Sequence, residues 1–199
     1  MLDLVGDLDR RFMARLICHY HYTHSVPSGK SHYFYHDGAV VVFAIPANPN
    51  ISKFLTGTPN VVWDMARLWA PDGHRPNLLT EAISVATLKL RKLEPDCTCL
   101  VSYADPSMGH TGGVYRAASW IYLGRTENRV WRGPNGEIIP RRKFHSGNTH
   151  INKPEIERLG FTEIRRPGKY RFAHGLTKQV RRHLFKMSEH FQLETKVTK

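Results

Sequence analysis

The side chains best suited to chemistry follow one short apolar run near the middle of the chain. Cys99 to Tyr103 is predicted to be a strand, and Asp105 comes shortly after it, directly before a proline. A strand end delivers side chains into a cleft, where a carboxylate can accept a proton from an amine or orient a donor group. An aspartate before a turn also forms Asx turns or caps the next helix, so both roles remain open for Asp105.

Three hydroxyl groups stand close to Asp105 in the sequence. Ser102 and Tyr103 are adjacent, and successive side chains of a regular strand point to opposite faces. Only one of them can share a cleft with Asp105, and we favour Ser102. Tyr115 follows on a short helix predicted over Gly113 to Ser119, and its hydroxyl can both donate and accept a proton. A half-buried ring with a satisfied hydroxyl is the alternative for Tyr115.

An arginine lies inside a second apolar run, which predicts a strand over Val61 to Ala70. A long cation in such a strand needs an anionic ligand or a partner, because burying an unpaired charge is costly. We therefore expect Arg67 to bind a carboxylate, a phosphate or a developing negative charge. The alternative is a structural salt bridge to Asp64 or Asp105.

Five of the twelve histidines crowd into residues 19 to 36, and several of them stand in a polar loop predicted over residues 19 to 30. Imidazole is a common ligand of iron, zinc and copper, and a histidine-rich loop also contacts phosphate. The spacing His-x-His does not by itself fix a metal site, so both uses remain open. The five are His19, His21, His24, His32 and His36.

The net charge of +12 is concentrated near the end of the chain. Residues 1 to 140 carry 14 Lys/Arg and 12 Asp/Glu, whereas residues 141 to 199 carry 15 and 5. Clustered cations favour a polyanion such as a nucleic acid, because neutralising phosphates releases counterions. A membrane surface is disfavoured, because no strongly apolar face accompanies the basic residues. The predicted DNA contacts are Arg141, Arg142, Lys143, Arg165, Arg166, Lys169, Arg171, Arg181 and Arg182.

Near the N-terminus we expect a helix followed by a hairpin. Leu4 to Leu16 mixes charged and apolar residues in a loosely helical pattern. His32 to Tyr35 and Gly38 to Ile45 are predicted strands, joined by an Asp-Gly turn that favours a hairpin. Pro46 to Asn60 is predicted to be a loop.

The central part of the chain alternates between strands and helices. Leu78 to Leu93 has apolar residues at helical spacing, and Asn77 is its predicted N-cap. Trp120 to Arg125 is predicted to be another strand. The order strand, helix, strand, helix, strand predicts an α/β (α+β) fold with a mixed central sheet flanked by helices.

The remaining elements are shorter and more basic. At 199 residues we expect a single core, with residues 1–130 as the catalytic body and residues 131–199 as a basic extension packed on it. No run of about 18 apolar residues exists, so we expect a cytoplasmic protein, and no pattern indicates an oligomeric state. The elements predicted after residue 130 are a hairpin through Asn135-Gly136, a helix at Glu155 to Leu159, strands at Phe161 to Ile164 and Tyr170 to Phe172, and a basic helix at Gln179 to Met187.

Val61 to Thr126 resembles the core of the N-acetyltransferase superfamily. In that superfamily, backbone amides of a glycine-rich loop between strand and helix cradle the pyrophosphate of acetyl-CoA. The equivalent segment here, Asp72 to Leu79, has one glycine, and Pro76 removes an amide donor. The resemblance implies an acetyltransferase-like core but disfavours acetyl-CoA as the cofactor.

A narrower resemblance rests on a long, spaced series of motifs. It covers about residues 19 to 125, and more loosely residues 169 to 172. The motifs are Met65-Ala66-Arg67-Leu68-Trp69-Ala70-Pro71, Ser102-Tyr103-Ala104-Asp105-Pro106, the run from Gly109 to Trp120, and Tyr122-Leu123-Gly124. This pattern looks like the Mom family of phage proteins, which place a carbamoylmethyl (acetamido) group on N6 of adenine and so protect phage DNA from host restriction.

The resemblance implies the same reaction on double-stranded DNA in the host cytoplasm. It implies catalytic roles for Asp105, Tyr115 and Arg67, with Ser102 and Tyr103 beside them. A histidine-tyrosine pair is also a family element, and of the two pairs present we favour His21-Tyr22 over His19-Tyr20. Fe(II) is a candidate cofactor, with His19, His21 and Asp105 as candidate ligands. The donor would be glycine-derived, as a small molecule or bound to a carrier.

Two other functions remain open from the sequence. The first is an acetyl-CoA-dependent N-acetyltransferase that acts on another amine, against which the incomplete glycine loop counts. The second is a non-enzymatic DNA-binding protein, which is disfavoured because no helix-turn-helix or zinc pattern is evident.

Overall fold

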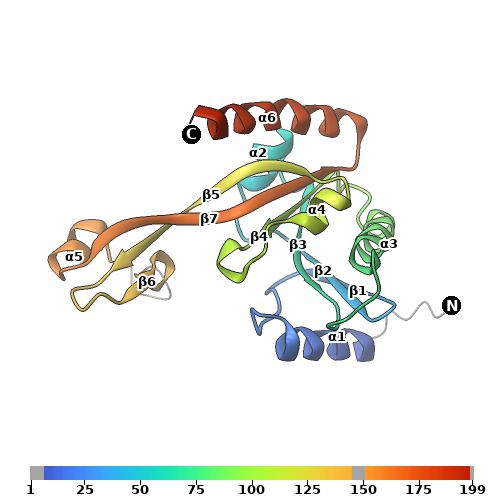
Figure 1. The fold of residues 1–199 in the computed structure, drawn as a ribbon, viewed down its shortest axis with the longest axis horizontal. Helices are drawn as coiled ribbons and strands as arrows, with labels where there is room; N and C mark the ends of the chain where they lie inside the picture. Colours follow the sequence, from blue (N-terminus) through green and yellow to red (C-terminus); the bar gives the residue numbers. More distant parts are fainter. Residues whose placement is uncertain (1–6, 145–150, 198–199) are drawn as a thin grey trace.

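A computed structural model describes residues 7–144 and 151–197, which form a single sheet with helices on both faces (Figure 1). The strands are β1 (Ser31–His36), β2 (Ala39–Ala44), β3 (Val62–Trp69), β4 (Cys99–Ala104), β5 (Ile121–Arg132), β6 (Ile138–Pro140) and β7 (Thr162–Gly175). The helices are α1 (Asp7–Tyr20), α2 (Ile51–Thr56), α3 (Leu78–Leu93), α4 (Gly113–Ala117), α5 (Lys153–Arg158) and α6 (Lys178–Val197), with 3-10 turns η1 (Pro106–Met108) and η2 (Arg141–Phe144).

The sheet has seven strands in the order β1-β2-β3-β4-β7-β5-β6. Only β3 and β4 are parallel, and every other neighbouring pair is antiparallel. The predicted α/β class with a mixed central sheet is therefore confirmed. Among the described residues, no helix is long and apolar enough to cross a membrane.

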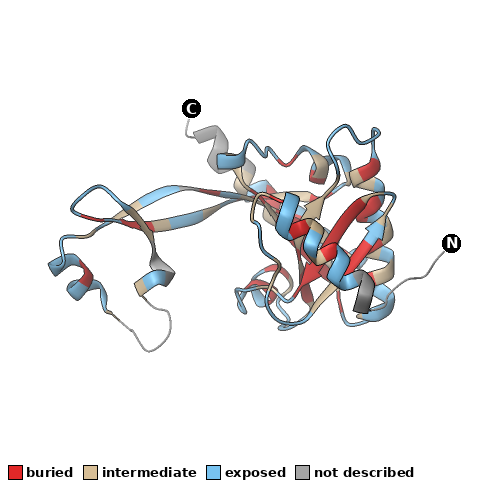
Figure 2. Ribbon diagram, turned by 90° about the horizontal axis from the view of Figure 1, so that it is seen from below, coloured by how far each residue is buried: buried red, intermediate tan, exposed pale blue. Residues whose placement is uncertain are grey.

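Helices cover both faces of the sheet. On one face α3 and α4 enclose a core that includes Phe43, Leu100 and Phe172. On the other face α2 and α6 pack over β4 and β7, while α1 packs on Val40 and Val42 of β2. Figure 2 shows the buried residues gathered in this body, whereas the far ends of β5 and β7 are mostly exposed.

The parallel strands β3 and β4 separate after a short paired stretch. Their last paired residues are Asp64 and Val101. Beyond this point β3 runs on to Trp69 beside β2, and β4 runs on to Ala104 beside β7. A fork therefore opens in the middle of the sheet, between two strands that each keep a partner on the outer side.

The outer halves of β5 and β7 leave the body as a two-stranded ribbon (Figure 1). The register shifts twice near the root of this ribbon, on either side of Arg125, and such bulges bend a strand pair. We call residues 126–144 and 151–168 the arm, which carries β6, η2 and α5 at its tip. At the root Gly168 packs against the backbone of Thr126, with no room for a Cβ atom.

Several predicted elements are confirmed. The helix Leu78–Leu93 has the predicted bounds, and both predicted hairpins form. In the first hairpin Asp37 and Gly38 have positive φ, as a tight hairpin turn requires. The prediction that Asn77 caps α3 is wrong, because Asn77 is left-handed and its side chain makes no capping hydrogen bond.

Other predictions are corrected by the structure. The predicted loop Pro46 to Asn60 contains α2, and α1 continues past Leu16 to Tyr20. The two short strands predicted around residues 161–172 are one continuous strand, β7, which lies between β4 and β5. The segment predicted to be an extension, residues 131–199, therefore supplies a central strand of the sheet.

Gly112 offers a test of how tightly the sheet and the loop before α4 are packed. Its φ is +80°, and a Cβ atom would stand 2.3 Å from two ring carbons of the buried Phe172. We expect Gly112→Ala to lower the free energy of unfolding by roughly 3 kcal/mol or more, from backbone strain and overpacking together. Urea unfolding measures the loss.

The matched control is Gly109→Ala in the same loop. Gly109 also has positive φ (+74°), but a Cβ atom there meets nothing within 4 Å. We expect this variant to lose only about 1 to 2 kcal/mol, from backbone strain alone. Equal losses in the two variants would contradict the packing of Gly112 against Phe172.

Candidate functional site

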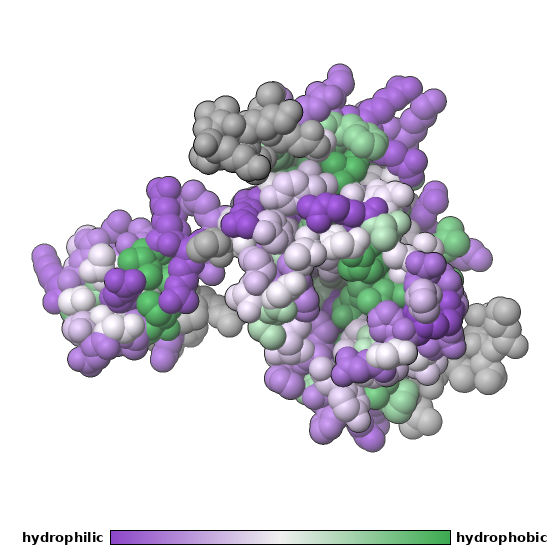
Figure 3. Space-filling model, viewed as in Figure 1, coloured by the Kyte–Doolittle hydropathy of each residue, from purple (hydrophilic) through white to green (hydrophobic). Residues whose placement is uncertain are grey.

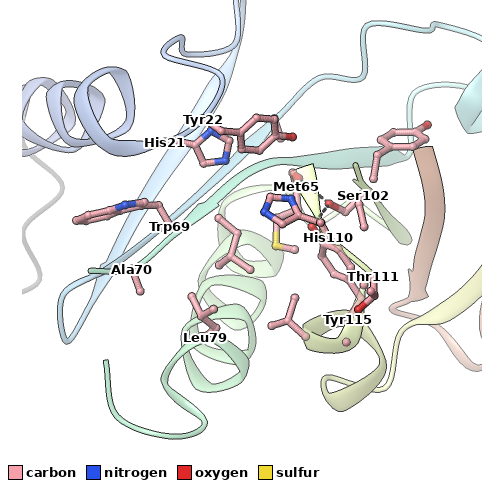
Figure 4. Close-up of a pocket in the computed structure, with 18 of the residues that line it drawn as sticks. His21, Tyr22, Met65, Trp69, Ala70, Leu79, Ser102, His110, Thr111 and Tyr115 are labelled. Atoms are coloured by element: carbon pink, nitrogen blue, oxygen red, sulfur yellow. Dashed lines mark hydrogen bonds between the residues drawn. The ribbon is translucent and has the colours of Figure 1, made fainter. Parts of the chain in front are cut away.

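A cavity of about 640 Å³ opens at the fork between β3 and β4 (Figure 4). Its walls come from both strands, from the start of α3, from the loop before α4 and from the segment that follows α1. Figure 4 shows His21 and Tyr22 on one side of the cavity, with Leu79 and Tyr115 across from them. Residues distant in sequence thus meet where the two parallel strands part.

Two hydroxyl groups lie at the base of the cavity. Ser102 is buried, and its Oγ donates to the Met65 carbonyl at 2.9 Å, which bridges the two strands just past the fork. The hydroxyl of Tyr115 lies 3.0 Å from the same Oγ and can donate to it. Burial raises the pKa of Tyr115 to about 12, so this phenol stays protonated at neutral pH. The structure brings together Ser102 and Tyr115, whereas the prediction paired Ser102 with Asp105. Tyr103 lines the cavity together with Ser102, so the expectation that only one of these neighbours faces the cleft is wrong.

Aromatic rings border the cavity. Tyr22 lies between His21, at a centroid distance of 4.5 Å, and His110, at 5.2 Å. Tyr20 stacks on Trp69 with centroids 5.4 Å apart and planes 17° apart, and Tyr20 is 59% exposed. All five side chains line the cavity, so it is walled by surfaces suited to a flat aromatic ligand.

His21 is buried and neutral at pH 7. Burial, and next the positive charge of Arg67, lower the pKa of His21 to about 4. The backbone N–H of Thr23 donates to Nδ1 of His21, so Nδ1 is the acceptor and Nε2 carries the proton. The favoured pair, His21-Tyr22, lines the cavity. Of the other pair, Tyr20 lines the cavity but His19 does not.

Arg67 does not line the cavity. Its Nε donates to the Ser25 carbonyl at 2.8 Å, its Nη2 to the Ser25 hydroxyl at 3.2 Å, and its Nη1 to the Ala66 carbonyl. The salt bridge to Asp64 or Asp105, the structural alternative predicted for Arg67, does not form among the described residues. The guanidinium instead ties the segment that carries His21 and Tyr22 to β3.

Asp105 is held at the edge of the site rather than in the cavity wall. Its Oδ1 accepts from the backbone N–H and the hydroxyl of Ser107, as in the Asx turn considered for it. Its Oδ2 lies 3.1 Å from the ammonium of Lys169. The hydrogen bonds from Ser107 and Lys169 outweigh partial burial and keep the pKa of Asp105 below its ordinary value. Asp105 is therefore ionised, one residue beyond Ala104 of the cavity wall.

Comparison with known protein families matches residues 4–192 to the Mom protein family. The match spans nearly the whole chain. This protein belongs to the Mom family. Membership places it among the enzymes of phage DNA adenine modification. No curated protein matches the sequence.

A buried carboxyl group, which the sequence did not single out as functional, lies at the fork between β3 and β4. Asp64 is the last residue of β3 paired with β4, and its Oδ1 is buried with no hydrogen-bond partner. Burial raises the pKa of Asp64 to about 7, although the positive charges of Arg67 and Lys169 act to lower it. Tyr103 is near this carboxyl, and burial, followed by the charge of Asp64, raises the pKa of Tyr103 to about 12.

The candidate iron ligands do not fit a facial ligand set. Asp105 is occupied by Ser107 and Lys169, and Nδ1 of His21 accepts from Thr23. Among residues 7–144 and 151–197, no three His, Cys, Asp or Glu side chains gather as a metal site. The candidate ligands His21 and Asp105 are thus held by other contacts in this structure.

The basic residues predicted to bind DNA do not form one surface. Lys143, Arg165 and Arg166 are exposed on the arm. Arg141 and Arg142 lie in η2, and their side chains are outside the described part of the structure. The arm thus carries most of the predicted contacts.

The other four predicted contacts lie on the body. Lys169 pairs with Asp105, and Arg181 and Arg182 are exposed on α6. Arg171 is partly buried beneath α6, with its guanidinium 4.7 Å from the Phe54 ring centroid and its Nη2 donating to the Leu123 carbonyl. Arg171 is therefore a packing residue in this structure, because apolar rings and a carbonyl occupy its charged end.

Sequence reasoning missed part of the cavity wall. Thr111 and His110 belong to it but stand in a loop without periodic pattern, and the stack of Tyr20 on Trp69 joins residues 49 positions apart. Asp64 does not line the cavity, but the sequence did hold a signal for its buried carboxyl group, namely a carboxylate inside an apolar strand. That signal predicted only a partner for Arg67.

The raised pKa of Asp64 predicts a distinct pH dependence of stability. In the unfolded chain this carboxyl ionises near its ordinary value of 3.8, whereas the folded protein keeps the proton up to about 7. The folded state therefore binds more protons in that window, and its stability falls as the pH rises through it. We expect the free energy of unfolding of Asp64→Asn, taken relative to wild type, to be roughly 2 kcal/mol higher at about pH 8 than at about pH 5.

Chemical denaturation at the two pH values measures this difference. Asp96→Asn is the matched control, because Asp96 is an exposed carboxylate on the body. We expect the control to change stability equally at both pH values. A pH-independent effect of Asp64→Asn would show that Asp64 ionises normally in the fold.

Proposed function

We propose that this Mom family protein transfers a carbamoylmethyl (acetamido) group to N6 of adenine in double-stranded DNA, and that the modification protects phage DNA from restriction in the host cytoplasm. The observation that carries the proposal is the cavity at the fork, with aromatic walls and the Ser102–Tyr115 pair at its base. The arrangement suits a planar base and places protic groups beside it.

The substrate base must leave the duplex to react. Adenine N6 points into the helix and its lone pair is delocalised into the ring, so an enzyme that acts there extrudes the base and holds it by stacking. Trp69 and Tyr22 are the proposed stacking surfaces. Trp120 is 5% exposed and packs on Tyr115 in the core, so it supports the site from behind.

The reaction forms a bond between N6 and the donor carbon, removes a proton from N6 and breaks the bond between that carbon and its leaving group. Tyr115 is protonated at neutral pH and is the proposed donor to the leaving group. The Nε2–H of His21 is a proposed donor to a ring nitrogen of adenine. Asp105, ionised at the edge of the cavity, is the proposed acceptor for the proton from N6.

Arg67 has a positioning role in this proposal. It holds the segment that carries His21 and Tyr22 through the Ser25 carbonyl and hydroxyl. Tyr103 and Asp64 lie together at the fork, where their ionisation is shifted by burial. Tyr103 lines the cavity and can contact the base, whereas Asp64 does not line it and contributes to its electrostatics.

A donor other than coenzyme A is favoured by the loop before α3. Arg75, the one arginine there, is held by Asp37 and by both carboxylate oxygens of Glu81. Asp72 lines the cavity and would repel a pyrophosphate. The proposed donor is therefore glycine-derived and arrives as a small molecule or on a carrier.

The sheet topology supports an acetyltransferase-like interpretation of the core. Its parallel pair β3 and β4 separates into a fork, and the helix between the two strands packs on one face. The site lies in that fork, where a strand pair without mutual hydrogen bonds can admit a ligand.

Mass spectrometry of nucleosides from plasmid DNA, recovered after expression of the protein, tests the proposal. Wild type is expected to yield deoxyadenosine heavier by one carbamoylmethyl group in place of one hydrogen. Tyr115→Phe should reduce that yield by about 100-fold or more, since general acid catalysis contributes on that order.

Tyr33→Phe is the matched control, because Tyr33 is equally buried but packs against α1 and does not line the cavity. It should give the wild-type yield. An unmodified adenine pool in the presence of folded wild-type protein would contradict the proposed function.

A further inference from the structure

The arm has features that the cavity does not require. It extends from the body as a separate lobe (Figure 3), and its outer strands pair over Glu127 to Arg132 and Thr162 to Pro167. No residue of the arm lines the cavity. An isolated ribbon is marginally stable in water, so an arm of this length needs its own stabilisation.

The tip of the arm has a small core. Trp131 is 2% exposed and Ile156 is fully buried. Phe144 packs edge-on against both Trp131 and Phe161, with ring centroids 6.3 and 5.3 Å away. The helix α5 begins with a capping box between Asn152 and Glu155. These contacts hold the arm as a defined structure rather than a loose loop.

The acidic groups of the arm are already occupied within it. Glu127 pairs with Arg129 and Arg165, and Glu155 belongs to the capping box. Lys153 pairs with Glu157 and Glu163. The carboxylate of Glu137 accepts from the backbone of its own turn. Three of these carboxylates are thus paired with cations of the arm, and the other two, Glu137 and Glu155, are held by backbone N–H groups.

Four exposed cations of the arm have no acidic partner among the described residues. Two of them lie on one face of the ribbon, because Arg166 stands opposite Asn128, which faces the same side as Arg132, and the other two lie on the tip. On the opposite face Arg129 stands directly across from Arg165, and Glu127 pairs with both. The four are Arg132, Lys143, Arg158 and Arg166.

We propose that the arm is a duplex-binding element that lies in a groove of double-stranded DNA, with Arg132 and Arg166 on one face of the ribbon and Arg129 and Arg165 on the other against the bordering phosphates. The major groove is about 12 Å wide and admits a two-stranded ribbon. Cations on both faces of such a ribbon meet the two phosphate backbones that border the groove. This inference rests on the proposed function for its choice of DNA as the polyanion.

The arm's attachment explains how binding there serves the cavity. The strand β7 runs without interruption from Arg166 in the arm to Phe172, whose ring packs 5.0 Å from that of Tyr115. At the root, Lys169 pairs with Asp105 at the edge of the site. A duplex held by the arm is therefore held next to the cavity, while α6 and its cations cover another face of the sheet.

The test compares two triple variants for binding to a fluorescently labelled duplex over a range of KCl concentrations. The arm variant carries Arg132→Gln, Arg158→Gln and Arg166→Gln. The matched control carries Lys53→Gln, Arg91→Gln and Lys92→Gln, which removes three exposed cations from α2 and α3 of the body. Thermal unfolding verifies that both are folded, and the single variant Arg132→Gln replaces the triple if it is not.

The arm variant should bind the duplex at least 10-fold more weakly at low salt, and the slope of log affinity against log salt should fall by about 2 to 3. The control should change affinity by less than about 3-fold. Wild-type binding by the arm variant, or an equal loss in the control, would overturn the proposal. A matched single strand bound by wild type as tightly as the duplex would also overturn it.

Nucleoside analysis separates this inference from the proposed function. If wild type leaves adenine unmodified while the arm variant alone loses duplex binding, the arm is a DNA-binding element of a protein with another activity. If wild type modifies adenine and the arm variant binds normally, the function stands and the inference about the arm is wrong.

Discussion

The separation of β3 from β4 is the constraint on which the rest of the structure depends. Neighbouring strands in a sheet normally satisfy each other's backbone groups, and leaving these buried without partners is costly. Here the pairing ends at Asp64 and Val101, and Ser102 Oγ donates to the Met65 carbonyl immediately beyond. The Ser102 hydroxyl thus replaces the backbone N–H that a paired strand would have donated to this carbonyl. It also positions the Tyr115 hydroxyl. Stability and chemistry use the same hydrogen-bond network.

Long β7 links the two functional parts of the molecule. Its inner half packs Phe172 beneath the cavity and its outer half forms one side of the arm. The bulges around Arg125 and the close approach of Gly168 to Thr126 mark the place where the ribbon leaves the body. A strand shared in this way couples the place where a polyanion would bind to the place where a base would react, without a separate domain.

Much of the fold was predictable because its signals are local. The spacing of apolar residues in Leu78–Leu93 and the Asp37-Gly38 turn needed only neighbouring residues. The continuity of β7 was not predicted, because Pro167 and Gly168 are typical of a break; the proline is tolerated next to the bulged root. The short helix α2 was missed because its six residues lack a side-chain cap.

The site was predicted in its residue types more than in its contacts. Ser102 and Tyr115 were both predicted to be site residues, but strand alternation led us to pair Ser102 with Asp105 rather than with Tyr115. Arg67 instead contacts Ser25, 42 residues away, and Asp105 contacts Lys169. Such long-range pairs depend on how the α1–β1 segment and the root of the arm pack on the sheet, which no local pattern reveals.

The central claim is that the cavity at the fork receives an adenine extruded from duplex DNA. The most direct measurement places the fluorescent adenine analogue 2-aminopurine at a modified position of a duplex, whose sequence is taken from DNA modified by the protein. Stacked 2-aminopurine is quenched, and stacking on Trp69 in the cavity quenches it as well, so protein added without donor should raise its fluorescence more for Trp69→Ala than for wild type. Saturating duplex binding by Trp69→Ala with unchanged fluorescence would contradict the claim.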